Sequence, residues 1–120
     1  MRIAPAAFAA MLAVAPAAAA EIAISLSIPV TGDTEVSSTS SIYECGDEEI
    51  SATYINAGDV SLAVLEIDGT TVVASNVIAA SGAKYAGAQY IWWTKGDEAN
   101  LYDLTEGGED APASTCAARE

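Results

Sequence analysis

The sequence predicts an all-β domain, and three observations support this prediction. Apolar and polar residues alternate over short runs, as they do in half-buried strands. Turn-forming pairs such as Asp68-Gly69 separate these runs at intervals of roughly ten residues. No apolar repeat with the 3.6-residue period of a helix occurs after residue 20. Together these features are typical of an antiparallel sandwich or small barrel of seven or eight strands.

The expected strands follow one another between recognisable turns. β-branched and aromatic residues favour the pleated backbone of a strand, whereas Gly, Asp and Pro interrupt it. On this basis, strands are predicted at residues 22–28, 36–44, 50–56, 61–67, 71–79, 89–94 and 98–104. Residues 106–114 are polar and contain Gly and Pro, so we expect a loop there. The chain contains no internal repeat, which predicts a single domain.

The first 20 residues have the pattern of a secretory signal peptide. Arg2 provides a short positive region, residues 3–14 are apolar and rich in alanine, and Ala18-Ala19-Ala20 matches the small-residue cleavage pattern. The apolar stretch is too short, and too interrupted by proline, to predict a membrane span. We therefore expect cleavage after Ala20. Because no cysteine lies near the cleavage point, we expect a soluble periplasmic protein that is not a lipoprotein and does not insert stably into a membrane.

Export makes the two cysteines informative, because disulfides persist in oxidising compartments. Cys45 and Cys116 lie near the two ends of the mature domain, and an even pair in such a chain most often forms a disulfide. A bridge that closes so long a loop stabilises a fold by about 4 kcal/mol in the chain-entropy model. Two free thiols are the alternative. No metal site is expected, because the sequence has no histidine and no C-x-x-C spacing.

The mature chain is strongly acidic. Without residues 1–20 it keeps three of its four basic residues and all 17 acidic ones, a net charge of −14. Nucleic acid and anionic membranes are poor partners for such a surface. A basic protein is a favourable partner, because a strong field speeds the association of opposite charges. Solubility alone is the alternative explanation of the acidity.

The composition also limits catalytic chemistry. Without histidine, Ser-His-Asp and Cys-His catalysis are excluded. No glycine-rich phosphate loop is present. Carboxylate clusters such as Asp47-Glu48-Glu49 fall in predicted turns, where solvation explains them better than calcium binding or acid–base catalysis does. We therefore predict no catalytic residue and no cofactor, and we do not expect an enzyme.

Residues 79–104 hold the candidate binding residues. Two turn-like segments, Ser81-Gly82 and Thr94-Lys95-Gly96, flank the densest aromatic run of the chain. A hydroxyl and one of the few cations therefore fall in predicted loops, where binding residues concentrate. Adjacent strand residues point to opposite faces, so we expect one of Trp92 and Trp93 in the core and the other outside. Ordinary hairpin turns are the alternative interpretation of both segments.

Around these residues the chain resembles the C-type lysozyme inhibitor domain family of Gram-negative bacteria. The matching motifs, in order, are Tyr43-Glu44-Cys45, Ala52-Thr53-Tyr54-Ile55-Asn56, Ser81-Gly82-Ala83-Lys84-Tyr85, Trp93-Thr94-Lys95-Gly96-Asp97-Glu98-Ala99 and Cys116. Two features depart from the family pattern. Gly46 follows Cys45 directly, where the family more often places glycine later, and residues 21–42 are longer than a minimal member needs.

The resemblance implies an antiparallel eight-stranded β-barrel with one disulfide, Cys45–Cys116. The barrel domain is expected at residues 43–116, after an N-terminal extension or first strand at 21–42 and before a tail at 117–120. The implied function is inhibition of c-type lysozyme, a basic protein. A secreted carbohydrate-binding β-domain that uses exposed Trp or Tyr is one alternative, and an envelope structural protein without a ligand is another.

The resemblance also assigns roles to the candidate residues. Ser81 and Lys95 would enter the active-site cleft of lysozyme and block its two catalytic carboxyl groups. An exposed Tyr85 or an outward-facing tryptophan would supply an apolar anchor beside them. The full set of expected lysozyme contacts is Ser81, Gly82, Tyr85, Thr94, Lys95 and Gly96.

Overall fold

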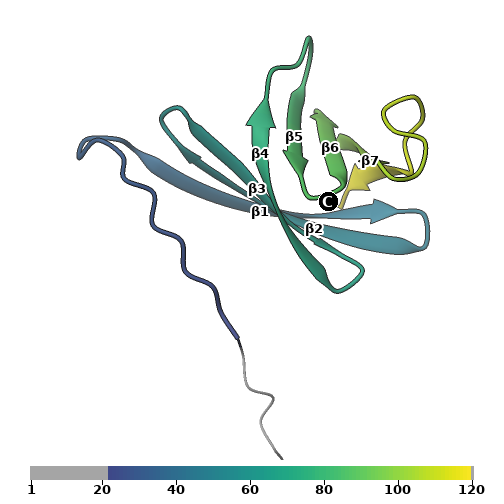
Figure 1. The fold of residues 1–120 in the computed structure, drawn as a ribbon, viewed down its shortest axis with the longest axis horizontal. Coiled ribbons are helices and arrows are strands. Elements are labelled where there is room, and N and C mark those ends of the chain that lie inside the picture. Colours follow the sequence, from purple (N-terminus) through teal and green to yellow (C-terminus); the bar gives the residue numbers. More distant parts are fainter. Residues whose placement is uncertain (1–21, 120) are drawn as a thin grey trace, which may run out of the picture.

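The computed structural model describes residues 22–119, and the predicted signal peptide at residues 1–20 lies outside the described residues. Eight antiparallel strands form a closed barrel in which every strand pairs with its sequence neighbours and the last returns to the first (Figure 1). The strands are β1 (Val36–Cys45), β2 (Glu48–Ala57), β3 (Val60–Ile67), β4 (Thr70–Val77), β5 (Ala83–Gly87), β6 (Tyr90–Lys95), β7 (Glu98–Asp103) and β8 (Ser114–Ala118). The predicted all-β class and the implied eight-stranded barrel are confirmed.

Turn chemistry accounts for the order of the hairpins. Asp68 and Gly69 join β3 to β4, with φ angles of 49° and 75°. Positive φ at both central residues is the requirement of a type I′ turn, whose twist matches that of the strands it joins. This hairpin was predicted from the Asp-Gly pair, and it is confirmed.

The barrel closes between β1 and β8 through a short seam. Among residues 22–119, Tyr43↔Ala118 and Glu44↔Ala117 are the two pairs in register across it. The disulfide between Cys45 and Cys116 lies directly beside these pairs and joins residues 71 positions apart. The predicted disulfide is confirmed, and it reinforces the described strand pair with the fewest residues in register.

Three sequence-based assignments of secondary structure were wrong. Residues 22–28 are not a strand, although apolar and polar residues alternate there; they run outside the barrel without a paired neighbour (Figure 1). Their apolar side chains are exposed, with Ile22 at 95%. The sequence analysis also missed β5 and β8, because both are short and rich in small residues with weak strand propensity. The barrel imposes extended structure on them through pairing on both sides.

The interior of the barrel holds one aromatic network. Trp92 is fully buried, and its ring meets the ring of Tyr43 edge to face with centroids 5.0 Å apart. The indole Nε1 of Trp92 donates to the Tyr54 hydroxyl at 2.9 Å, and the hydroxyls of Tyr54 and Tyr43 lie 2.8 Å apart. Burial raises the pKa of Tyr54. These contacts fix the interior side of β6, and the outer side of the same strand carries Trp93 and Lys95.

Candidate functional site

The two predicted loops meet at one end of the β5–β6 hairpin. Ala83 and Thr94 are the paired residues at the end of this hairpin farthest from its turn. Just before it, Gly82 has a φ of +69°, and a Cβ there would lie 2.2 Å from the Thr94 carbonyl oxygen. The same Cβ would lie 2.7 Å from Cγ of Lys95. Only glycine combines this backbone conformation with so close an approach. The contact brings the segment bearing Ser81 against the segment bearing Lys95.

Trp93 connects these two segments on the outer side of β6. Its indole Nε1 donates to the backbone carbonyl of Ser81 at 2.8 Å. The ammonium groups of Lys84 and Lys95 lie 4.9 Å and 5.2 Å from its ring centroid, within the range of a cation–π interaction. Trp93 is half-buried, whereas Trp92 is in the core. The prediction that the two tryptophans face opposite sides is therefore confirmed.

The other predicted contact residues divide by exposure. Ser81, Gly82, Lys95 and Gly96 are exposed at the rim of the barrel. Thr94 is half-buried, and its hydroxyl donates to the Ala83 carbonyl at 3.3 Å. This hydrogen bond links the β6 side chain to the backbone of β5.

Tyr85 does not occupy the place expected for it. The expectation that its ring is exposed is wrong, because Tyr85 is 6% exposed and pairs in register with Trp92 on the inner side of the barrel. Its ring centroid lies 5.7 Å from that of Tyr54, and burial raises the pKa of Tyr85. The period-two alternation of β5 directs Lys84 outward and Tyr85 inward.

Ile78 is an apolar side chain at this rim that the sequence analysis did not single out. β4 ends at Val77, one residue earlier, and the side chain of Ile78 is 100% exposed. The sequence placed Ile78 inside a strand predicted over 71–79, where an isoleucine is unremarkable. The only signal at this position was the Ala-Ala-Ser-Gly turn that follows it.

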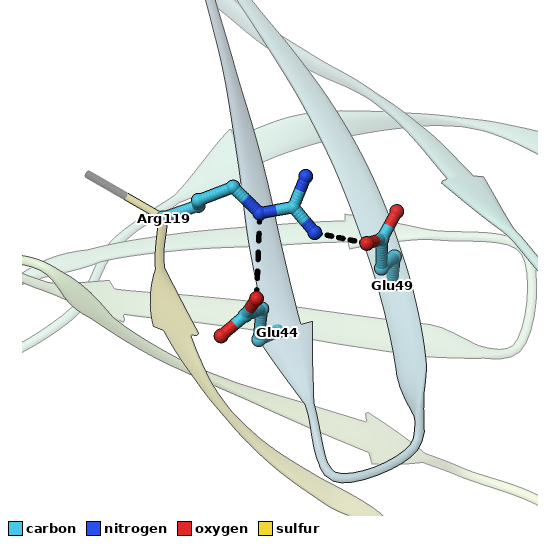
Figure 2. A network of polar contacts seen from close by, with 3 residues as sticks. All are labelled: Glu44, Glu49 and Arg119. Carbon is cyan, nitrogen blue, oxygen red and sulfur yellow. Dashed lines mark hydrogen bonds and ion pairs between the residues drawn. The ribbon is translucent and has the colours of Figure 1, made fainter.

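Arg119 is engaged by carboxylates on the barrel wall. Its guanidinium, which follows β8, lies between Glu44 of β1 and Glu49 of β2 (Figure 2). Nε donates to Glu44 at 3.3 Å, and a second nitrogen donates to Glu49. The hydrogen bond to Glu49 is the main cause that raises the pKa of Arg119 further. This cation is already neutralised within the chain.

The two lysines near Trp93 differ in whether they form an ion pair within the chain. Lys84 forms an ion pair with Glu109 of the β7–β8 connection. Lys95 forms no ion pair with any residue of the described range 22–119. The rim therefore presents one lysine without an ion pair among the described residues, on the segment that packs against Gly82, next to Ser81.

The outer side of β6 and β7 carries a shallow pocket next to Lys95, with a volume of about 90 Å³. It is lined by Trp93, Lys95, Glu98, Ala99, Asn100 and Tyr102. Residues 22–119 contain no cluster of carboxylate, cysteine or histidine side chains suited to a metal ion. No helix within this range is long and apolar enough to cross a membrane.

Comparison with known proteins identifies a family and individual relatives that this chain resembles. The model of the family described as membrane-bound lysozyme-inhibitor of c-type lysozyme matches residues 43–110. A protein of that name from Pseudomonas aeruginosa is 58% identical over 67 residues, and one from Cupriavidus necator is 48% identical over 67 residues. Each alignment covers 55% of this chain and 53% or 54% of the relative. The chain thus spans about half the length of the curated relatives it matches.

A solved structure extends the comparison. The crystal structure of Pseudomonas aeruginosa MliC in complex with hen egg white lysozyme matches with a TM-score of 0.65 and 42% sequence identity. The match covers 82% of this chain and all of the other. Both the relatives and this structural neighbour are lysozyme inhibitors by name or complex, which agrees with the expectation that the chain is not an enzyme.

The comparisons correct the expected localisation. The sequence analysis expected a soluble periplasmic protein that is not a lipoprotein, whereas the matching family and both relatives are described as membrane-bound. The expectation rested on the absence of a cysteine near the predicted cleavage point. A single missing residue type was too narrow a criterion, and the expectation is wrong.

Proposed function

Because this chain belongs to the family of membrane-bound inhibitors of c-type lysozyme, we propose that it binds c-type lysozyme and blocks its active-site cleft with Ser81 and Lys95. The relatives carry this activity in their names, and the structural neighbour was solved with hen egg white lysozyme bound. The inhibitor needs no catalytic group of its own, since it acts by occupying the cleft.

The chemistry of the target explains the choice of these two side chains. Glycosidases of the lysozyme type hold two carboxyl groups about 5 Å apart, one a protonated acid and the other ionised. A lysine ammonium neutralises the ionised group. A serine hydroxyl can hydrogen-bond the acid, because it donates or accepts as required. Lys95 and Ser81 supply one group of each kind.

The observation that carries the proposal is the uncompensated charge of Lys95 beside Ser81. Within residues 22–119 the other two cations, Lys84 and Arg119, are paired with carboxylates of the chain. Lys95 is exposed and unpaired in that range, and Gly82 holds its segment against that of Ser81. A cation that lacks an internal partner is available for a carboxylate of another protein.

The acidity of the chain has a proposed role in the same complex. The mature chain carries 17 acidic residues, and within residues 22–119 Lys95 is the cation that forms no ion pair. A basic lysozyme would be attracted at long range by this field and positioned at short range by the rim. The rate of association should then fall as added salt screens the field.

Substitution of Lys95 tests the proposal. We expect Lys95→Ala to weaken lysozyme binding by roughly 2–5 kcal/mol, because a carboxylate of the target is left buried and unpaired. Ser81→Ala should cost less, on the order of 1 kcal/mol. Calorimetry with hen lysozyme measures both values, and turbidity of bacterial walls during lysis measures the inhibition.

Arg119→Ala is the matched control for this substitution. It removes the same charge from a guanidinium that is already paired, so we expect a change of at most about 1 kcal/mol. Equal losses for Lys95→Ala and Arg119→Ala would show that only net charge matters and would exclude Lys95 from the cleft. Unchanged wall lysis at a molar excess of the wild-type chain would refute the function itself. Retention on peptidoglycan without lysozyme would favour the carbohydrate-binding alternative.

A further inference from the structure

We propose that Trp93 is a positioning residue that holds Ser81 and Lys95 at a fixed spacing before the target arrives. This inference rests on the proposed function and adds a residue to it. Neither binding role in that proposal belongs to Trp93. Its contacts reach both segments: a hydrogen bond to the Ser81 backbone and a ring close to the Lys95 ammonium.

The first contact fixes the segment that carries Ser81. Positions 78–82 connect β4 to β5, two strands paired at only three positions, Ser75↔Ala86, Asn76↔Tyr85 and Val77↔Lys84. Among the described residues, one hydrogen bond reaches this connection, and it runs from Trp93 Nε1 to the Ser81 carbonyl. A bond to the backbone of Ser81 leaves its hydroxyl free for a partner. Trp93 therefore orders the loop without occupying its functional group.

The second contact restrains the side chain of Lys95. Residues two apart on a strand share a face, so Trp93 and Lys95 both lie on the outer side of β6. The ammonium is 5.2 Å from the ring centroid, where the negative face of an indole attracts a cation. A free lysine side chain loses several rotatable bonds on binding. A lysine that already rests near an indole loses fewer, which lowers the entropic cost of the complex.

Lys84 explains why the ring can serve Lys95. Its ammonium lies 4.9 Å from the same ring centroid, and two like charges beside one ring would repel each other. Glu109 pairs with Lys84 and compensates its charge. The β7–β8 connection thus contributes a carboxylate that keeps the surroundings of Trp93 compatible with a second cation. Lys95 remains the uncompensated one.

Two substitutions separate the two contacts. Trp93→Phe keeps an aromatic ring and removes the N–H donor, whereas Trp93→Leu removes both. We expect the dissociation constant for hen lysozyme to rise about fivefold in Trp93→Phe, the effect of one hydrogen bond. In Trp93→Leu we expect a rise of about twentyfold, because the cation–π contact is also lost. Melting temperatures establish that each variant is folded.

Double-mutant cycles distinguish positioning from general support. If Trp93 acts through Ser81, the Trp93→Phe effect shrinks to below twofold in a Ser81→Ala background. If it also acts through Lys95, the difference between Trp93→Leu and Trp93→Phe disappears in a Lys95→Ala background. A purely structural role predicts the same loss in every background, and that result would overturn the inference.

A third variant and a second readout complete the test. Lys84→Met removes a cation near the ring without touching either loop, and we expect less than a twofold change in affinity. A loss as large as that of Trp93→Leu would also overturn the inference. Proteolytic cleavage within the 78–82 connection of the free protein should accelerate several-fold in Trp93→Phe, because the bond to the Ser81 carbonyl no longer holds this loop. This measurement needs no lysozyme, so unchanged cleavage refutes the positioning role, while absent inhibition by the wild-type chain refutes the function.

Discussion

Two adjacent tryptophans contrast the packed interior of the barrel with the exposed rim that carries the candidate binding residues. Trp92 and Trp93 both donate an indole N–H, one to the Tyr54 hydroxyl inside the barrel and the other to the Ser81 carbonyl outside it. Trp92 is fully buried, whereas Trp93 is half-buried beside two lysines. The same chemical group stabilises the fold in one case and orders a loop in the other.

The difference follows from the alternation of a single strand. Successive side chains of β6 point alternately into the barrel and away from it. The interior neighbours of Trp92 come from β1 and β2, distant in sequence, and the neighbours of Trp93 come from the flanking hairpins. A substitution at Trp92 should therefore act on stability, and one at the rim should act on binding.

The largest effect is expected from Trp92→Ala. Truncation of a fully buried tryptophan leaves a cavity and removes the hydrogen bond to Tyr54, at a cost of roughly 3–5 kcal/mol in the free energy of unfolding. Urea unfolding followed by circular dichroism measures this cost. Lysozyme affinity per folded molecule should be little changed. A variant with native stability and lost binding would reverse the assignment of the two tryptophans.

The next effect is expected from Gly82→Ala, which acts on the contact between the two rim segments. The added Cβ meets the Thr94 carbonyl at 2.2 Å in a left-handed backbone conformation. We expect a loss of roughly 2–4 kcal/mol of stability, together with weaker lysozyme binding as the segments move apart. Thermal unfolding and calorimetry report the two quantities.

Gly96→Ala is the matched control for that experiment. Gly96 has a φ of +58°, but a Cβ there meets no atom within 4 Å. It therefore carries the backbone strain without the collision, and about 1–2 kcal/mol of destabilisation is expected. Similar values for the two glycines would mean that the close approach at Gly82 contributes nothing.

Local features of the barrel were easier to predict from sequence than contacts between distant segments. The Asp68-Gly69 turn, the disulfide and the opposite orientation of Trp92 and Trp93 follow from local rules and from the number of cysteines. Strand β5 could not be predicted, because its extended structure comes from pairing with β4 and β6. With β5 unrecognised, nothing in the sequence indicated that Tyr85 faces inward. The close approach of Gly82 to Thr94 and Lys95 depends on the folded barrel, so the sequence could not predict it.

The residues that pair the cations illustrate the same limit. Arg119 is 75 positions from Glu44, and Lys84 is 25 positions from Glu109. Ion pairs at such separations are a consequence of topology. The sequence identified Lys95 through its motif, but only the folded chain distinguishes it from the two engaged cations. That Ser81 and Lys95 contact lysozyme stays a prediction.

The last of these effects concerns the interior hydroxyls and has a defined pH dependence. Burial raises the pKa of Tyr54 above its unfolded value near 10, so the folded state holds this proton more tightly than the unfolded state. The stability that Tyr54 contributes is complete below about pH 10 and is lost as the pH rises further.

Tyr54→Phe tests this interior network directly. At neutral pH the variant should be less stable by about 1–3 kcal/mol, because the indole N–H of Trp92 loses its acceptor. Above about pH 10 the wild-type stability should fall more steeply than that of the variant, so their urea midpoints should converge. Parallel curves would assign the alkaline loss to other groups. Lysozyme affinity at neutral pH should be unchanged, since the hydroxyl lies on the opposite side of β6 from Trp93.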